Sequence, residues 1–263
     1  MRKVLVVDVG GNNVKVSQGG RGEALKIPSG PDMTAARMAS EVRQAVGSWK
    51  YDAVSIGYPG AIKAGKPAHE PRNLGGGWMR LDYRKAFGKP VKLVNDAAMQ
   101  ALGSYQGGRM LFLGLGTGLG SALVAEGVLM PLELAHLPYR KGRSFEDYVG
   151  ERGLKRLGRR KWTAHVHKVV ALLRAGLQAD YVVLGGGQTK KLESLPPGVR
   201  LGNNEHAITG GLRLWEEEPK RSRRRRKPAA APSEPEPAVE SASPEAPPQP
   251  EGEPAAGGPV GEP

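Results

Sequence analysis

Short apolar runs that end near glycine recur along the chain, and they limit the possible folds more than any other feature. These runs occupy residues 4–7, 53–56, 111–115 and 181–184. Runs of this length, bounded by Gly and Pro, are typical of buried strands. We therefore expect a core that is built around short strands with glycine turns at their ends.

Helical patterns alternate with these strands, and the same order occurs twice. Helices are expected over residues 33–46, 97–105, 145–157 and 161–177. Further short strands at 14–17 and 24–27 precede the first helix, and strands at 121–124 and 127–129 follow the run at 111–115. We expect a duplicated α/β architecture, with an N-terminal lobe at 1–106, a C-terminal lobe at 107–215 and a cleft between them.

The composition changes after Trp215. Residues 216–263 are mostly Glu, Pro, Ala, Ser and Arg, with almost no aliphatic side chains. Such a segment buries too little apolar surface to offset its ordering entropy, so we expect a disordered tail.

The part of the chain before this tail is strongly basic. The whole sequence has 39 basic and 26 acidic residues, and the tail holds 7 and 10 of them. Residues 1–215 therefore carry 32 basic and 16 acidic side chains, a net charge of +16. This charge favours anionic partners such as nucleic acid, an acidic membrane or a phosphorylated substrate.

Several classes of protein are not expected from this sequence. It has no cysteine, so disulfides, thiolate metal sites and thiol nucleophiles are excluded. The first apolar run is too short for a signal peptide, and no stretch approaches the roughly 18 apolar residues of a membrane span. We expect a cytoplasmic protein.

Three glycine turns lie at strand ends, where phosphate groups can be bound. The first, Gly10-Gly11-Asn12, lies between Asp8 and Lys15, and the others are Gly116-Thr117-Gly118 and Gly185-Gly186-Gly187. Adjacent glycines let backbone N–H groups approach a phosphate, and Lys15 adds a positive charge. Asp8 is a candidate ligand for Mg²⁺, directly or through water. A plain hairpin turn with a solvated Lys15 is the alternative for the first turn.

Asp96 follows a predicted strand and begins a predicted helix. An N-cap role is the structural interpretation, since Asp is a favoured N-cap residue. The functional interpretation is a carboxylate that takes the proton from an attacking hydroxyl during phosphoryl transfer.

Glu133 and His136 lie three residues apart, so both would face one side of a helical turn. We expect them to bind adjacent sugar hydroxyls, with a surface pair as the alternative. Zinc is not expected, because no further ligands accompany them. Glu146 is ambiguous by itself, because acidic residues are ordinary in a first helical turn.

A basic stretch follows these residues. Either it is a solvated helix face or it is a docking surface for a long polyanion. Its members are Lys141, Arg143, Arg152, Lys155, Arg156, Arg159, Arg160 and Lys161.

Seven motifs together resemble the ROK family of sugar kinases, and within it the polyphosphate glucokinases. In order they are DVGGNNVK, GYPG, NLGGGW, VNDAA, GLGTGLGSA, ELAHL and VVLGGG. The resemblance implies an actin/hexokinase-like (RNase H-like) fold with two lobes around a central cleft. It also implies transfer of a phosphoryl group from polyphosphate or ATP to a hexose, with Mg²⁺. Dimers are common in this family.

The resemblance assigns roles to individual residues. Asp96 would be the catalytic base, and the hexose would be held by Asn73, Asn95, Glu133, His136 and Glu146. Asp8, Gly10, Gly11, Asn12 and Lys15 would line the first phosphate loop. Gly116, Thr117 and Gly118 would form the second, and Gly185, Gly186 and Gly187 would border the donor.

Four departures from the family pattern stand out. Asn12 replaces the usual Thr or Ser, and Ala135 replaces the usual Gly, where a methyl group would shift His136 or narrow the sugar pocket. The Cys-rich zinc motif of many family members is missing, as in the polyphosphate glucokinases. The end of the second lobe, residues 208–215, reads as less helical than the closing helix of the family.

Two other functions compete with a hexose kinase that uses glucose. A ROK repressor is not expected, since the first strand begins at Val4 and leaves no room ahead of it for a helix-turn-helix. The Arg223–Arg226 run reads as a nonspecific electrostatic arm, so no specific nucleic acid is expected. A catalytically weak sugar sensor, or a kinase for another hexose, is the stronger alternative.

Overall fold

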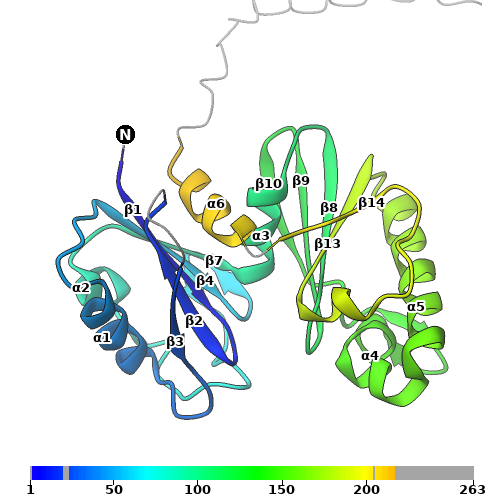
Figure 1. Ribbon diagram of the computed structural model, residues 1–263, viewed down its shortest axis with the longest axis horizontal. Coiled ribbons are helices and arrows are strands. Elements are labelled where there is room, and N and C mark those ends of the chain that lie inside the picture. Colours follow the sequence, from blue (N-terminus) through cyan, green and yellow to red (C-terminus); the bar gives the residue numbers. More distant parts are fainter. Residues whose placement is uncertain (1, 20–23, 204, 217–263) are drawn as a thin grey trace, which may run out of the picture. The chain divides into compact units, whose positions relative to one another are not determined.

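The computed structural model describes residues 2–19, 24–203 and 205–216, and it contains two five-stranded sheets with helices (Figure 1). The predicted tail, 216–263, lies outside the described residues except for Glu216, and so does the Arg223–Arg226 run. None of the described helices combines the length and apolar character that crossing a bilayer requires.

The first sheet has the strand order β3-β2-β1-β4-β7. Strands β1, β2 and β3 pair antiparallel, whereas β4 and β7 add to β1 in parallel. The strands are β1 (Val4–Val9), β2 (Asn13–Ser17), β3 (Leu25–Pro28), β4 (Ala53–Tyr58) and β7 (Val91–Asn95). Helices α1 (Ala35–Val46) and α2 (Tyr83–Phe87) and the hairpin of β5 (Ile62–Lys63) and β6 (Lys66–Pro67) lie in the connections.

The second sheet repeats this plan with the order β10-β9-β8-β13-β14. Again three strands pair antiparallel and two add in parallel. The strands are β8 (Arg109–Leu115), β9 (Leu119–Ala125), β10 (Val128–Leu132), β13 (Tyr181–Gly185) and β14 (Val199–Leu201). Between them lie β11 (Pro138–Arg140), β12 (Arg143–Ser144), α4 (Phe145–Val149), α5 (Glu151–Gly176) and the 3₁₀ helix η1 (Gly187–Lys191).

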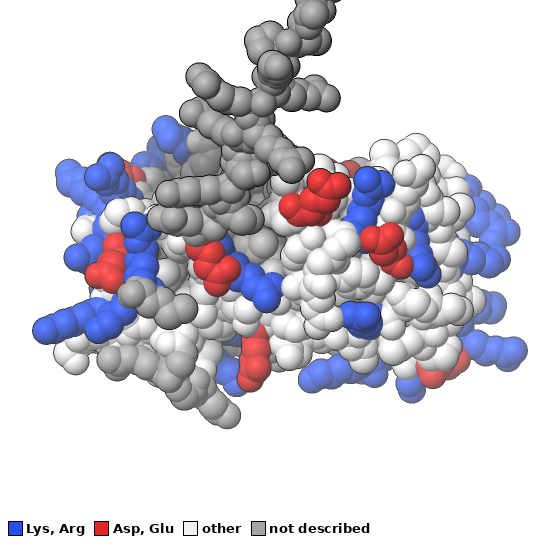
Figure 2. Space-filling model, turned by 90° about the horizontal axis from the view of Figure 1, so that it is seen from above, with Lys and Arg blue, Asp and Glu red and all other residues white. Residues whose placement is uncertain are grey.

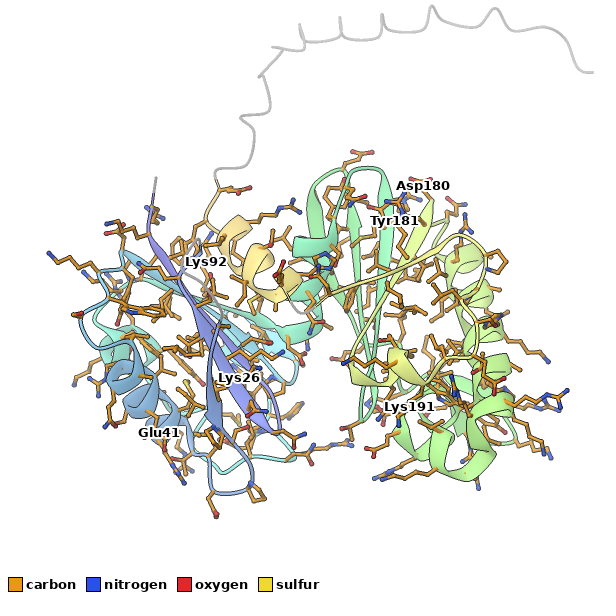
Figure 3. The ribbon with its side chains drawn as sticks, in the orientation of Figure 1. Lys26, Glu41, Lys92, Asp180, Tyr181 and Lys191 are labelled. Atoms are coloured by element: carbon orange, nitrogen blue, oxygen red, sulfur yellow. The ribbon has the colours of Figure 1, made fainter. Side chains whose placement is uncertain are left out.

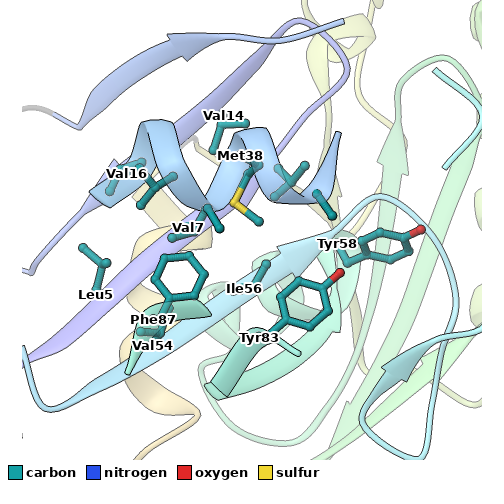
Figure 4. Packing of buried hydrophobic residues seen from close by; sticks show 14 of the residues in the cluster. Leu5, Val7, Val14, Val16, Met38, Val54, Ile56, Tyr58, Tyr83 and Phe87 are labelled. Atoms are coloured by element: carbon teal, nitrogen blue, oxygen red, sulfur yellow. The ribbon is translucent and has the colours of Figure 1, made fainter. Parts of the chain in front are cut away.

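One face of the first sheet packs against α1 and α2 (Figure 4). Leu5, Val7 and Val9 alternate with residues on the other face and meet Met38 of α1 and Phe87 of α2. This alternation is the period of two expected of a strand covered on both faces. The sheet is therefore buried on both sides, and its strand ends are held in fixed positions.

The fifth strand of each sheet leads into a helix, and these two helices pack against each other. They are α3 (Asp96–Ser104) after β7 and α6 (Glu205–Arg213) after β14. One side of α3 contributes Ala97, Ala98 and Ala101 to a cluster with strands of the second sheet. Met99 instead packs with Val4 and Val6 of the first sheet and with Ala207 of α6. Helix α3 thus joins the two sheets.

Glycine lets α3 and α6 touch backbone to backbone. A Cβ at Gly103 would overlap the carbonyl of His206, and a Cβ at Gly210 would overlap the carbonyl of Met99. Arg213 strengthens the crossing, because its guanidinium donates to the carbonyl oxygens of Leu102, Gly103 and Tyr105 at the end of α3. The expectation that residues 208–215 are less helical is wrong up to Arg213, since its glycines serve this contact.

Glycine also divides the region predicted as helices 145–157 and 161–177. Helix α4 ends at Val149, because Gly150 is extended and a Cβ there would lie 2.9 Å from the carbonyl oxygen of Thr117. Helix α5 then continues beyond residue 157 but is kinked at Gly158, where φ is 73° and ψ is 161°. The predicted lobe boundaries at 106 and 215 stay predictions.

We predict that Gly103→Ala destabilises the protein by roughly 1–3 kcal/mol, because the added methyl forces the two helices apart. Gly176→Ala is the matched control, since Gly176 is also helical and has nothing within 4 Å of an added Cβ. The control should be neutral or stabilising by up to about 1 kcal/mol. Urea unfolding of both variants measures the difference, and equal stabilisation of both would contradict the close crossing.

Candidate active site

Asp8 and Asp96 lie at the same edge of the first sheet because β1, β4 and β7 are parallel. Asp8 pairs in register with Gly57 of β4, and β7 ends at Asn95, immediately before Asp96. Gly57 has no side chain in the narrow space between Asp8 and Met99. A Cβ at Gly57 would lie 3.4 Å from Oδ1 of Asp8 and would overlap the side chain of Met99. The GYPG motif begins at Gly57, but the sequence alone does not predict that this glycine makes room beside Asp8.

The N-cap of α3 is Asn95 and not Asp96. The Asn95 side chain accepts a hydrogen bond from the N–H of Ala98 at 3.1 Å and donates another to the carbonyl of Gly60 at 3.1 Å. Asp96 is the first helical residue, and its Oδ1 accepts from the N–H of Ala97 at 2.8 Å. The structural interpretation of Asp96 as an N-cap is therefore wrong, because its neighbour fills that role.

Burial and a second carboxylate perturb Asp96. Burial raises the pKa of the Asp96 carboxyl to about 7, repulsion from Asp8 adds to the shift, the N–H of Ala97 opposes it, and Glu133 adds a smaller repulsion. Strongly perturbed acids in the interior of a site are frequent at catalytic positions. Asp96 is thus a carboxyl group that changes its protonation near neutral pH.

Asp8 is buried, and among the residues that the structure describes Lys15 is the cation beside it. Burial raises the pKa of the Asp8 carboxyl, and Lys15 opposes this shift. Lys15 Nζ lies 3.7 Å from Asp8 Oδ2, so the side chain of Lys15 reaches back toward the strand end. Two adjacent carboxylates with a single cation leave negative charge that a divalent ion would neutralise.

The first phosphate loop is closed by hydrogen bonds of its own. The N–H of Gly10 donates to the carbonyl of Asn13 at 3.0 Å, and the hydroxyl of Ser29 donates to the carbonyl of Gly10 at 2.7 Å. Gly11, Asn12 and Asn13 are exposed at its tip. The N–H of Gly10 is therefore engaged inside the loop, whereas the tip of the loop is exposed to solvent.

Asn73 is exposed beside this loop. A Cβ at Gly11 would lie 3.8 Å from the Cβ of Asn73. Asn73, which is predicted to bind the sugar, thus lies next to Gly11, which is predicted to bind phosphate.

The second glycine turn lies against the start of α3 and the α4–α5 junction. A Cβ at Gly120, just after the turn, would lie 2.8 Å from the Cβ of Ala97, next to Asp96. The N–H of Glu151 donates to the carbonyls of Gly116 and Thr117, both at 3.2 Å. A Cβ at Gly118 would overlap the carboxylate of Glu146, so Glu146 lies at this turn.

The third glycine turn follows β13, which pairs in parallel with β8. Gly186 has a φ of 87°, and a Cβ there would overlap the backbone of Leu115, directly before Gly116. Gly187 is exposed and begins η1. The second and third turns are therefore neighbours.

Glu133 and His136 lie in a turn after β10 rather than on a helix, so the expected helical turn is wrong. Both side chains are exposed, and the N–H of Glu146 donates to the carbonyl of Ala135 at 3.0 Å, which ties this turn to α4. Ala135 is buried in the cluster around α5, so its methyl group packs into that core. Glu133 acts electrostatically on Asp96, whereas His136 makes no hydrogen bond with a described residue.

All eight cations of the basic stretch are exposed. Lys155 pairs with Glu151 at 2.8 Å, Arg156 donates to the carbonyl of Asp147, and Arg159 contacts the end of η1. On a different face, drawn in Figure 2, Lys and Arg side chains are likewise spread over the surface, with fewer Asp and Glu among them. The stretch is thus exposed to solvent, and part of it also has structural contacts.

No group of three or more His, Asp or Glu side chains in the described ranges is arranged to hold a metal ion. Mg²⁺ commonly keeps several waters and binds one or two carboxylates together with substrate phosphates. Asp8 fits that mode of binding, which needs no cage of protein ligands.

Comparisons with known proteins agree with this architecture, although no family model matches the chain. A polyphosphate glucokinase of Mycobacterium leprae is 24% identical over a region that spans 73% of this chain and 65% of that protein. A polyphosphate/ATP-glucomannokinase from Arthrobacter has a similar structure, with a TM-score of 0.66, 22% identity and coverage of 81% of this chain and 98% of that chain.

A ROK-family glucokinase from Streptomyces griseus, solved with glucose and AMPPNP, has a TM-score of 0.63 and 17% identity, with coverage of 81% and 98%. These similarities confirm the expected two-sheet α/β fold and the resemblance to ROK sugar kinases near the polyphosphate glucokinases.

We predict that Asp96→Asn makes the protein more stable at pH 8 by roughly 1–4 kcal/mol. The pKa of Asp96 is about 7 in the folded state against 3.8 for an unperturbed Asp, so the folded state binds more protons between these values. The free energy of unfolding of the wild type must then fall as the pH rises from about 3.8 to about 7. The uncharged Asn does not titrate, so the variant does not lose this stability.

Urea unfolding at pH 4 and pH 8 measures the effect, and the advantage of the variant should shrink at pH 4. Asp32→Asn is the control, since Asp32 is exposed and its side chain makes no hydrogen bond with a described residue. A difference for Asp96→Asn that is independent of pH would contradict the shifted pKa.

Proposed function

We propose that this protein is a hexose kinase that transfers a phosphoryl group from polyphosphate or ATP to the 6-hydroxyl of glucose. The comparisons support the coarser class, a sugar-kinase phosphotransferase. The hexose, the donor and the residues that act are the content of the proposal.

A single observation carries it: the partly buried carboxyl of Asp96, with a pKa of about 7, at the strand edge that also holds Asp8 and Lys15. A general base is most effective when its pKa lies near the working pH. The second glycine turn supports this assignment, because Gly120, just after it, lies against Ala97, next to Asp96.

In the proposed reaction, the oxygen of the sugar 6-hydroxyl attacks the terminal phosphorus of the donor. The bond from that phosphorus to its bridging oxygen breaks, and the hydroxyl proton passes to the Asp96 carboxylate. The products are the sugar 6-phosphate and either ADP or a polyphosphate one unit shorter.

The other residues orient the reactants. Asn95 is fixed by its bonds to Ala98 and Gly60, so an unused N–H of its amide can bind a sugar hydroxyl in a set orientation. Asn73, Glu133, His136 and Glu146 are the further candidates for the sugar, and Glu146 also lies close enough to Gly118 to contact the donor.

Mg²⁺ would be held by Asp8, directly or through water, and when bound it neutralises charge on the donor phosphates. Lys15 adds a fixed cation beside Asp8. The tip of the first loop, Gly11 and Asn12, and the second and third glycine turns would enclose the phosphates through their backbone N–H groups.

Polyphosphate is favoured as donor by charge. Residues 1–215 carry a net charge of +16, and Arg152 of the exposed basic stretch directly follows Glu151, whose N–H binds the second glycine turn. A long polyanion gains from every cation along its path, whereas ATP reaches only the nearest ones. A rate that falls steeply with salt for polyphosphate, and less for ATP, would support this choice.

A matrix of hexoses against ATP and polyphosphate, with Mg²⁺ present, tests the proposal directly. Turnover with glucose and polyphosphate supports it. Turnover with ATP alone would contradict polyphosphate as donor, and preference for another hexose would contradict glucose. Sugar binding without turnover would favour the sensor, for which Asn12 and Ala135 are the motivating departures.

We predict that Asp96→Asn lowers kcat by at least about 10²-fold, because the variant lacks the proton acceptor. Binding of glucose, measured by calorimetry, should stay within a few-fold of wild type, since the amide keeps the shape of the carboxyl. Asp32→Asn again serves as control. Equal turnover in Asp96→Asn and wild type would rule out Asp96 as the base.

We also predict a pH dependence for kcat/KM. Because the base must be unprotonated, log(kcat/KM) should rise with a slope of about one below pH 7 and level off above it, as the pKa of Asp96 requires. Initial rates between pH 5 and 9 at fixed ionic strength measure this profile. A flat profile between pH 5 and 8 would contradict the assignment.

A further inference from the structure

Three polar side chains along α5 hold the segment that follows η1. Arg159, Thr163 and His167 are spaced by four residues, so they lie on one face of the helix. Arg159 donates from Nε to the carbonyl of Lys191 at 2.7 Å and from Nη2 to that of Leu192 at 3.2 Å.

The next two residues of the segment are held in the same way. Thr163 Oγ1 accepts the N–H of Glu193 at 3.4 Å, and His167 Nε2 lies 3.0 Å from the carbonyl oxygen of Ser194. We name residues 187–194 the donor strap. Four consecutive residues of this strap, 191–194, are thus tied to one helix.

The donor strap begins at the third glycine turn. The hydroxyl of Thr189 donates to the carbonyl of Gly186 at 2.8 Å, which closes the first turn of η1, and η1 contacts β8. Figure 3 labels Lys191 at the end of this short helix. Lys190 and Lys191 are both exposed, and neither side chain makes a hydrogen bond or ion pair with a described residue.

The kink at Gly158 gives each half of α5 a different glycine turn to support. Glu151, at the start of the first half, binds the carbonyls of Gly116 and Thr117. Arg159, at the start of the second half, binds the end of η1. Nothing lies within 4 Å of a Cβ added at Gly158, so glycine serves there for its left-handed φ of 73° and not for space.

We propose that Arg159 is a positioning residue that holds the donor strap so that Lys190 and Lys191 bind donor phosphates beyond the one transferred. This inference rests on the proposed function, because it assumes an anionic phosphoryl donor at the third glycine turn. Arg159 suits the role since its planar guanidinium donates two bonds in a fixed geometry, which Lys does only in part. Without the Arg159 side chain, Lys190 and Lys191 are still present, but the segment that carries them is no longer held in one position.

The experiment compares Arg159→Ala with Lys168→Ala. Both variants remove one exposed cation from α5, but Lys168 lies outside the basic stretch, and its side chain makes no hydrogen bond or ion pair with a described residue. Binding of ATP and of tripolyphosphate to the full chain, with Mg²⁺ and without sugar, is measured by calorimetry. Hydrogen exchange over residues 187–194 reports the order of the strap, and the melting temperature reports folding.

We predict that Arg159→Ala weakens tripolyphosphate binding about ten-fold, as expected when the competent arrangement of the strap falls to about a tenth of the population. Exchange over 187–194 should rise at the same time. Lys168→Ala should stay within about two-fold, and Arg159→Lys should recover part of the affinity. In steady state, the donor KM of Arg159→Ala should rise while its sugar KM stays unchanged.

A double variant, Lys190→Ala with Lys191→Ala, separates the strap from its cations. It should lose affinity for tripolyphosphate while exchange over 187–194 stays at the wild-type level. Equal donor binding by Arg159→Ala and Lys168→Ala would overturn the inference, and so would unchanged binding by the double variant. Weaker binding by Arg159→Ala than by Lys168→Ala in a protein without hexose turnover would support the inference and contradict the proposed function.

Discussion

The arrangement of the candidate site depends on the backbone contact between α3 and α6. Each helix follows the last strand of its own sheet, and Gly103 and Gly210 let the two meet more closely than any side chain would allow. Because α3 also packs on strands of both sheets, its first residue has little freedom. Asp96 therefore stays in place although no side chain in the described part of the chain makes a hydrogen bond with it.

A carboxyl held in this way lowers the stability of the folded protein above neutral pH. Burial and the nearby Asp8 both disfavour its charged form, and the N–H of Ala97 compensates only in part. Lys15 partners Asp8 and not Asp96, so the positive charge stabilises the group proposed to hold the metal. The surrounding structure, with Asn95 as cap and two sheets against α3, provides the stability that the acid removes.

The strands were predictable because each is a short apolar run between glycines, and the glycine turns were predictable as loops. The N-cap was not, since Asn95 and Asp96 are both good caps and only the bond from Asn95 to Ala98 distinguishes them. The end of α4 and the helix over residues 205–213 were not predictable for a related reason. Gly150 does end α4, whereas Gly210 lies inside α6, where it allows the backbone of α3 to approach. Whether a glycine breaks a helix or admits a neighbour depends on tertiary contacts that a single sequence does not contain.

The two sheets share one topology but differ at the position where chemistry is proposed. Asp8 of β1 pairs in register with Lys15 on one side and Gly57 on the other. The corresponding residue of β8 is Gly114, which pairs with Gly120 and Gly185. One strand end thus presents a carboxylate and an ammonium, whereas its counterpart presents three glycines in a row. Charged groups suit the edge that is proposed to bind a metal and accept a proton, and bare backbone suits the edge that is proposed to bind phosphates. The duplication supplies two equivalent strand ends, and under this proposal these few residues give each end a different role.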